Sequence, residues 1–294
     1  MTPTPLVSVV LPTYNRAKTL ERAIRSVLNQ TFRDFELIIT DDGSTDESRS
    51  ILSRYSDLKN VRVISSTHRG CSVARNLGVT ASRAPLIAFQ DSDDEWLLPM
   101  LEKAVAALSS TTSSAGIFYS DMVRIYADGS SGDVRSPDVF RGALVSESTL
   151  DYQVAGIGIQ ASMIKRACFD QVGLFDEALP RFIDLDLFIR LSDHFDFHHH
   201  GEALVKYYVS DGISADTHAL VLARRYLLRK YRKRLWVHRH HLANQYLLLA
   251  DALRMTGSKY RSRALGVLAL LTSFADSRVR RKAADILLVA SKRS

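Results

Sequence analysis

Three carboxylates follow a short apolar stretch near residue 90. Residues 86–90 read LIAFQ, and Asp91, Asp93 and Asp94 come directly after them. An apolar run of this length is typical of a strand buried on both faces of a parallel sheet. Carboxylates this close repel one another unless a cation lies among them, and their oxygens are the ligands that a divalent ion carrying phosphates prefers. The turn therefore predicts a metal site. The alternative is a solvated acidic loop that caps the next helix.

Two other predicted strands end in acidic or aromatic residues. Residues 35–40, FELIIT, run into Asp41 and Asp42, and residues 6–11, LVSVVL, run into a turn that carries Tyr14. Open α/β sheets bind ligands at the carboxyl ends of their strands. We expect one crevice there, in which an aromatic ring and a metal-binding turn flank a nucleoside diphosphate. Asp42 could accept a hydrogen bond from its base or ribose, although it could equally help to cap the following helix.

The elements that carry these turns alternate along the chain. Apolar residues at helical spacing predict helices at 17–29 and 71–81. Ser44 and Glu47 have the spacing of a capping box, which predicts another helix starting at Ser44. Such alternation indicates a parallel sheet with right-handed crossovers. No GxGxxG or GxxxxGK[ST] fingerprint occurs, which argues against the usual Rossmann and P-loop sites. The predicted strands are 6–11, 35–40, 61–65, 86–90 and 115–121.

Four segments together resemble the successive motifs of family 2 glycosyltransferases. They are VSVVLPTYNR, SVLNQTFRDFELIITDDGSTDES, GCSVARNLGV and APLIAFQDSDDEW, in the family's order across roughly residues 6–100. A weaker similarity continues to about residue 210. The resemblance implies an α/β fold of the GT-A nucleotide-diphospho-sugar transferase type, with a mostly parallel sheet flanked by helices. It also implies an inverting sugar transfer from a nucleotide diphosphate, most commonly UDP, to an acceptor hydroxyl.

The nucleotide-binding residues of the family carry over by position. Pro12 and Tyr14 would flank the base, and Asp42 would contact it, with Asp41 in a supporting place. Arg75, in the ARN triplet, would lie near the diphosphate.

The metal-binding residues carry over in the same way. Asp91 and Asp93 match the DxD pair, with Asp93 as the direct ligand of Mn²⁺ or Mg²⁺. Asp94 would support the turn.

The catalytic base is expected at the start of the helical stretch FIDLDLFIRLSDHF. The family places a Glu-Asp pair there, with the Asp as the base. The register puts Asp184 at that position and Ile183 in place of the glutamate. Asp186 is the alternative base, and because two residues turn a helix by about 200°, only one of the two can face the crevice. Both could instead be first-turn carboxylates that the helix dipole favours.

Charge divides the chain into two regions. Residues 217–294 hold 18 of the 39 Lys and Arg residues but only three of the 32 Asp and Glu residues. Such a split indicates regions with different partners. We predict a GT-A glycosyltransferase domain at 1–216 and an all-helical basic extension at 217–294. Its helices are predicted at 219–231, 238–255, 261–274 and 278–290.

Other sequence features predict a cytoplasmic protein with at most peripheral membrane contact, on the inner face. Cys71 and Cys168 suggest no disulfide framework and fit a reducing compartment. The N-terminus lacks the features of a signal peptide. The longest apolar run, 264–271, falls far short of the roughly 20 residues that span a bilayer.

The basic region also bears on partners. Residues 224–239 interleave Tyr226, Tyr231 and Trp236 with basic side chains, which suits an anionic membrane surface or a solvated basic face. No nucleic-acid module is recognisable, which argues against nucleic acid. By analogy with bacterial surface-polysaccharide assembly, a glycan or lipid-linked acceptor is expected. The histidines at 198–200 and at 238, 240 and 241 lack zinc spacing and are expected at the surface or at strand ends.

Two other classes of function remain open from the sequence. One is a non-catalytic nucleotide-sugar-binding domain with a helical tail that binds a membrane or a partner. The other is a nucleotidyltransferase, which needs a glycine-rich loop after the first strand. The sequence there, PTYNR, has no glycine, which argues against it.

Overall fold

The computed structural model describes residues 4–109, 114–209 and 216–288. The chain forms two compact units, each built from several segments of the sequence. Unit 1 comprises Met1–Gly142, Gly156–Glu177 and Arg190–Ser210, and unit 2 comprises Ala143–Ala155, Ala178–Ile189 and Asp211–Ser294.

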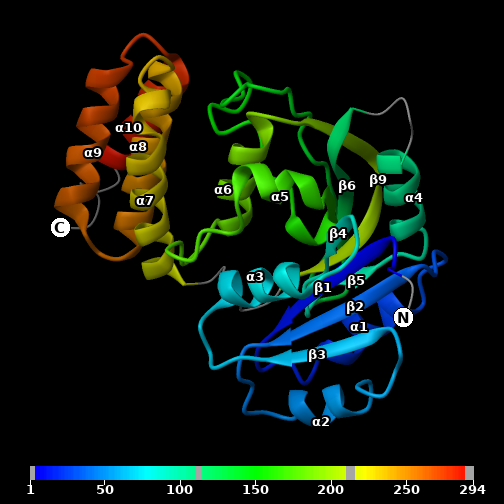
Figure 1. Ribbon diagram of the computed structural model, residues 1–294. Coiled ribbons are helices and arrows are strands. Elements are labelled where there is room, and N and C mark those ends of the chain that lie inside the picture. Colours follow the sequence, from blue (N-terminus) through cyan, green and yellow to red (C-terminus); the bar gives the residue numbers. More distant parts are fainter. Residues whose placement is uncertain (1–3, 110–113, 210–215, 289–294) are drawn as a thin grey trace. The chain divides into compact units, whose positions relative to one another are not determined.

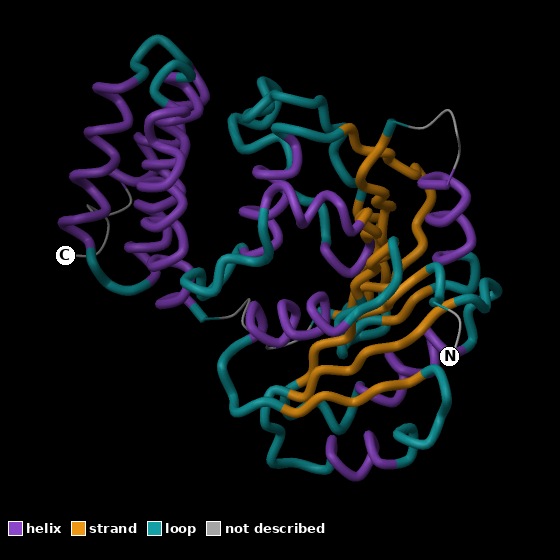
Figure 2. Tube along the Cα trace, in the orientation of Figure 1, coloured by secondary structure: helices purple, strands orange, loops and turns teal. Residues whose placement is uncertain are grey.

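Unit 1 is built on one mixed sheet of nine strands (Figures 1 and 2). Four strands from the first 90 residues pair in parallel in the order β3-β2-β1-β4, and the later strands continue the sheet as β8-β6-β9-β5, with β7 paired to β6. The parallel half and the α/β class are as predicted. The strands are β1 (Val7–Thr13), β2 (Phe35–Asp41), β3 (Val61–Ser65), β4 (Leu86–Phe89), β5 (Glu95–Trp96), β6 (Ala115–Ile125), β7 (Ser131–Val134), β8 (Ser162–Lys165) and β9 (Asp196–Tyr208).

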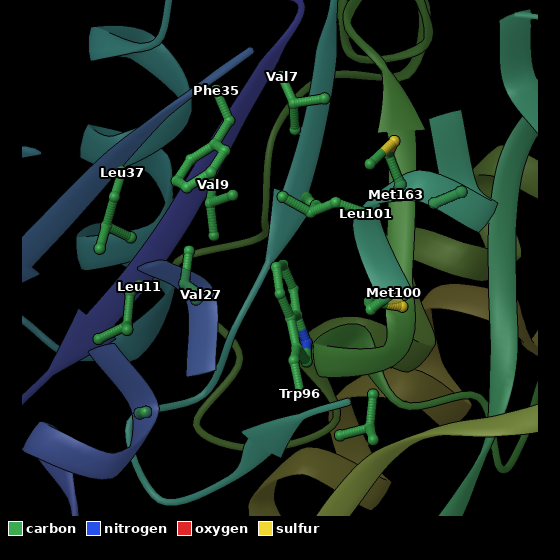
Figure 3. Close-up of a cluster of buried hydrophobic side chains, with 14 of the residues drawn as sticks. Val7, Val9, Leu11, Val27, Phe35, Leu37, Trp96, Met100, Leu101 and Met163 are labelled. Carbon is green, nitrogen blue, oxygen red and sulfur yellow. The ribbon is translucent and has the colours of Figure 1, made fainter. Parts of the chain in front are cut away.

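Alternate residues of the parallel strands face two different helix layers. Val7, Val9 and Leu11 of β1 lie in the main core beside Phe35 and Leu37 of β2 (Figure 3). The intervening residues face α3, where a Cβ on Gly78 would lie only 2.4 Å from a methyl carbon of Val10. These strands are therefore apolar on both faces, as expected for a parallel sheet. The helices of unit 1 are α1 (Leu20–Leu28), α2 (Ser48–Ser53), α3 (Cys71–Ala81), α4 (Met100–Ser109) and α5 (Arg166–Val172), with a 3₁₀ turn at Ile159–Ala161.

The predicted helix start at Ser44 is wrong. Helix α2 begins at Ser48, and the Ser44 hydroxyl instead accepts a hydrogen bond from the backbone N–H of Asn15 at 2.9 Å. Asn15 adopts a left-handed backbone with φ 50°, and its side-chain oxygen accepts from the N–H of Thr45 at 2.8 Å. The loop after β1 and the loop after β2 are thus bonded to each other, which holds both loops at the edge of the sheet.

Unit 2 is mainly helical. Helix α8 (Arg239–Met255) packs against all three of its neighbours, and its long buried face forms the centre of this unit. The other helices are α7 (Thr217–Leu235), α9 (Lys259–Thr272), α10 (Ser277–Leu288) and the part of α6 (Ile183–Ser192) that precedes Arg190. Unit 2 also takes in residues 143–155 and 178–189, which lie before the boundary predicted at residue 216. Across the described parts of the chain, no helix has the length and apolar character needed to cross a membrane.

Candidate active site

The acidic turn follows β4 directly and is held by α1. The backbone N–H of Asp94 donates to the carbonyl of Asp91 at 3.2 Å, which closes the turn. Thr19, just before α1, donates its hydroxyl to the carbonyl of Ser92 at 2.8 Å, and Arg22 of α1 donates to the carbonyl of Asp93. The helix after the first strand therefore fixes the shape of a turn more than 70 residues later.

Two arginines lie against the carboxylates of this turn. Arg75 of α3 bonds Asp91 Oδ1 at 2.5 Å, and Arg16, in the loop after β1, approaches Asp93 Oδ2 at 3.3 Å. The side chains of Asp91 and Asp93 keep 26% and 19% of their surface exposed. Each carboxylate is thus oriented by a cation and is still open to solvent.

Asp94 has a different environment. It is 1% exposed, and its Oδ1 accepts from the backbone N–H of Tyr208 at 2.9 Å. Burial raises the pKa of the Asp94 carboxyl well above its usual range, and the nearby charges of Asp91 and Asp93 raise this pKa further. Asp94 is therefore placed to tie the turn to β9, and it is too enclosed to meet a ligand.

The residues of the turn fit a divalent metal. Asp91 and Asp93 offer carboxylate oxygens at a partly exposed edge, and oxygen ligands of this kind suit Mn²⁺ and Mg²⁺. The charges of both carboxylates also act to raise the pKa of the neighbouring Asp94 carboxyl.

Asp42 organises the loop between β3 and α3. Its carboxylate accepts from the hydroxyl of Ser66 at 2.6 Å and from the backbone N–H groups of Arg69 and Gly70, each at 2.8 Å. Burial acts to raise the pKa of Asp42, but these three bonds outweigh it and hold the pKa below its usual range. With 3% of its surface exposed, Asp42 is first of all an anchor for residues 66–70.

The aromatic residue of the site is paired. The Tyr14 ring stacks on His68, with ring centroids 4.0 Å apart, and His68 Nδ1 lies 3.4 Å from Asp42 Oδ2. Tyr14 is one of the exposed aromatic side chains, so a planar base could stack on this pair.

Pro12 and Asp41 are buried in the strands. Pro12 pairs with Thr40 of β2, and β1 has already separated from β4 at this point, so the missing N–H of proline costs no ladder bond there. Asp41 Oδ1 accepts from the N–H of Ser44 at 3.0 Å. Both residues shape this edge of the sheet from inside.

These groups converge on the first turn of α3. Burial raises the pKa of the Cys71 thiol, Arg75 lowers it, and the charges of Asp91, Asp42 and Asp93 raise it. Carboxylates from two strand ends and the arginine thus lie within electrostatic reach of one atom, as the parallel sheet predicts.

Further polar side chains are buried at the same strand ends. The hydroxyls of Thr13 and Thr40 have no hydrogen-bond partner within the described ranges. The same is true of the side-chain oxygen and nitrogen of Gln90. Sequence reasoning missed these residues, together with Arg16, whose only signal was a basic residue after the YN turn.

The two candidate bases lie in unit 2 and have separate environments. Asp186 is 0% exposed, and its Oδ1 lies 2.6 Å from Lys230 Nζ and accepts from the Tyr231 hydroxyl at 2.7 Å. Asp184 is partly exposed, and its Oδ1 accepts from the N–H of Leu185 at 2.8 Å. Phe182, just before α6, has a left-handed backbone with φ 61°. The Cζ atom of Arg224 lies over the Phe182 ring, 4.7 Å from the ring centroid.

Known proteins share the sequence motifs. Residues 8–136 match the family model described as glycosyl transferase family 2. A UDP-Glc:alpha-D-GlcNAc-diphosphoundecaprenol beta-1,3-glucosyltransferase, WfgD of Escherichia coli, is 35% identical over 103 residues, which cover 35% of this chain and 41% of that protein. The chain spans about a third of the length of the first curated relatives that it matches.

Solved structures share the fold. Staphylococcus aureus TarS in complex with UDP-GlcNAc aligns with a TM-score of 0.59 at 18% identity, covering 96% of this chain and 89% of that one. The mannosyltransferase PcManGT of Pyrobaculum calidifontis, in complex with GDP-Man and Mn²⁺, aligns with a TM-score of 0.57 at 18% identity, covering 99% and 87%. The predicted GT-A fold is confirmed, and residues 8–136 are similar to glycosyl transferase family 2.

Proposed function

We propose that this protein is an inverting, metal-dependent glycosyltransferase that moves a sugar from a nucleotide diphosphate donor to a hydroxyl of a glycan or lipid-linked acceptor. The observation that carries the proposal is the convergence of the acidic turn, Arg75 and the Asp42 loop at the carboxyl ends of β4, β1 and β2. An aromatic pair and oriented carboxylates at the same edge of the sheet match the two halves of such a donor.

These contacts support the proposed donor-binding roles. The Tyr14–His68 pair offers a face for the base, and the Asp42 anchor keeps residues 66–70 beside it. Arg75 and Arg16 hold the carboxylates of Asp91 and Asp93 in one orientation. When bound, Mn²⁺ or Mg²⁺ would supply Lewis-acid stabilisation of the charge on the departing diphosphate.

Asp184 is proposed as the general base that takes the proton from the acceptor hydroxyl. Asp186 is paired with Lys230 and Tyr231. Asp184 lies two residues earlier in α6 and is partly exposed. A base must come within hydrogen-bond reach of the proton that it removes, and a buried ion-paired carboxylate meets that requirement poorly. One displacement inverts the anomeric centre without a protein nucleophile.

The acceptor class is proposed from two observations. The related WfgD has a name that specifies a lipid-diphosphate-linked acceptor. Helix α9 and the segment after it expose apolar side chains, among them Val267, Leu271 and Phe274, on a strongly basic region with exposed Lys259 and Arg261. Such a face suits peripheral contact with an anionic membrane in which a lipid-linked acceptor would lie.

The experiment is a calorimetric titration of the full chain with UDP, dTDP and GDP and their sugars, with and without Mn²⁺. We expect metal-dependent binding of one base class, lost in Asp93→Asn and retained in Asp133→Asn, whose carboxylate is exposed on β7. Absence of binding to every nucleotide would overturn the proposal. Binding without transfer to any acceptor hydroxyl would favour the non-catalytic nucleotide-sugar-binding alternative.

A further inference from the structure

Two histidines and a glutamate meet in unit 2. They lie far from the acidic turn in the sequence, and two of the three are nitrogen ligands instead of carboxylates. Glu147, His238 and His241 each place one potential ligand atom so that the three atoms lie within 4.8 Å of one another. No zinc spacing is visible in the sequence, because Glu147 lies more than 90 residues before the two histidines. The fold of unit 2 brings the segment 143–155 against α8.

That segment is already fixed to α8 by hydrogen bonds. Asn244 donates to the carbonyl of Leu150 at 2.7 Å, and Gln245 donates to the carboxylate of Asp151 at 2.8 Å. The backbone that carries Glu147 is therefore held near the start of α8, and only its exposed side chain needs to move to adjust a ligand distance.

His241 provides an independent observation. It is 1% exposed, although the sequence led us to expect a residue at the surface or at a strand end. Its Nε2 lies 3.0 Å from the carbonyl of Ser146, and because a carbonyl only accepts, Nε2 carries the hydrogen. Nδ1 is then left with a lone pair, and it is buried with no hydrogen-bond partner among the described residues.

This arrangement is the one found in metal-binding histidines. Such a histidine usually donates its other ring N–H to a carbonyl, which fixes the ring and the tautomer. The His241 ring lies edge-to-face with His238, with ring centroids 5.7 Å apart. Two imidazoles and one carboxylate are a ligand set that zinc uses, with a fourth position left for water.

We propose that Glu147, His238 and His241 form a second metal site, which takes Zn²⁺ and clamps the segment 143–155 to the start of α8. Zinc–ligand bonds are about 2.0–2.2 Å long, so ligand atoms as far as 4.8 Å apart must draw closer to share one ion. The Glu147 side chain is 78% exposed, so it can make most of that movement.

The test is a titration of the purified full chain with Co²⁺, followed by displacement with Zn²⁺. The chain carries Asp93→Asn so that the acidic turn contributes no metal. We expect one equivalent of Co²⁺ with the visible absorption of tetrahedral coordination, displaced by one equivalent of Zn²⁺. Glu147→Gln and His238→Ala should each weaken binding by at least about tenfold, since even second-shell changes cost that much.

His240→Ala is the matched control, because His240 is on the same helix but bonds Ser273 instead of the cluster. It should leave the affinity unchanged. Absence of saturable binding would overturn the proposal, as would equal affinity in the wild type, Glu147→Gln and His238→Ala. Equal weakening by His240→Ala would also overturn it. Glu147→Gln changes an exposed side chain, so a loss of metal there cannot be attributed to unfolding.

Discussion

Replacing the two candidate bases one at a time separates catalysis from stability. Asp186→Asn removes the charge opposite Lys230 and weakens the bond from Tyr231 inside unit 2. Breaking a fully buried ion pair costs about 3–5 kcal/mol, but Lys230 keeps 30% of its side chain exposed and can regain water. A hydrogen bond to a charged group contributes about 1.5–3 kcal/mol, so we expect a loss of about 2 kcal/mol.

The expected loss is large enough to measure. For a domain of about 100 residues, each kcal/mol shifts the melting temperature by roughly 4–8 °C. Thermal unfolding followed by circular dichroism should therefore show Asp186→Asn melting well below the wild type. Asp184→Asn changes a partly exposed side chain and should alter stability by less than about 0.5 kcal/mol.

Activity should show the opposite order. A general base contributes about 10²–10⁴-fold to the rate, so Asp184→Asn should lower kcat by at least about a hundredfold with unchanged donor affinity. Nucleoside diphosphate release in the presence of an acceptor measures this, at a temperature well below the melting point of both variants. If Asp184→Asn keeps wild-type turnover while folded Asp186→Asn loses it, the assignment of the base is refuted.

Three further changes test other parts of the structure. Asp42→Asn should cost about 2 kcal/mol at pH 7 in urea unfolding. Because the folded-state pKa of Asp42 is lowered, its stabilisation is present above the unfolded pKa of about 3.9 and is lost as pH falls through the folded value, so equal costs at pH 7 and pH 3 would contradict this reasoning. Gly78→Ala could gain about 1 kcal/mol in helix propensity, but its Cβ would meet Val10 at 2.4 Å, and overpacking costs about 1–3 kcal/mol. We expect net destabilisation, and a double-mutant cycle with Val10→Ala that shows strict additivity would argue against the clash. Leu271→Ser on α9 should reduce sedimentation with anionic vesicles but not with neutral ones, whereas the matched exposed leucine change Leu58→Ser in unit 1 should have no effect.

The parallel half of the sheet could be predicted from the sequence because its signals are local. Strand β3 and helix α3 occupy the predicted residues, and α1 differs from its prediction only at the ends. Continuous apolar runs separated by helical periodicity leave few other arrangements. Asp128 and Gly129 form another local signal, because an Asp-Gly pair favours a tight turn, and they lie in the turn between the paired strands β6 and β7.

The failure at Ser44 has a long-range cause. A serine three residues before a glutamate fits a capping box when only the local sequence is considered. In the structure the serine hydroxyl is used by Asn15, about 30 residues earlier, and the helix starts four residues later, where the N–H of Ser48 donates to Asp46 at 3.0 Å. A competing partner from another loop is invisible to local pattern reasoning.

The carboxylates illustrate the same limit in the candidate site. Asp91, Asp94 and Asp186 are the same residue type in similar strand-end or helix-start positions, and the resemblance to the family assigns them roles that the local sequence does not distinguish. Their partners do: Arg75 leaves Asp91 oriented and open, the backbone of Tyr208 encloses Asp94, and Lys230 with Tyr231 encloses Asp186.

The division has a consequence for chemistry, because a carboxylate can act on a ligand only where its oxygens are still open to solvent. Asp94 and Asp186 are buried, so they can only hold other groups in place. Loss of the Asp94 carboxylate should first destabilise the turn, and loss of the Asp186 carboxylate should first destabilise α6. Partial exposure leaves Asp91, Asp93 and Asp184 able to meet a metal or a hydroxyl. A family motif therefore predicts where functional carboxylates lie in the sequence, and their burial and hydrogen-bond partners decide which of them can react.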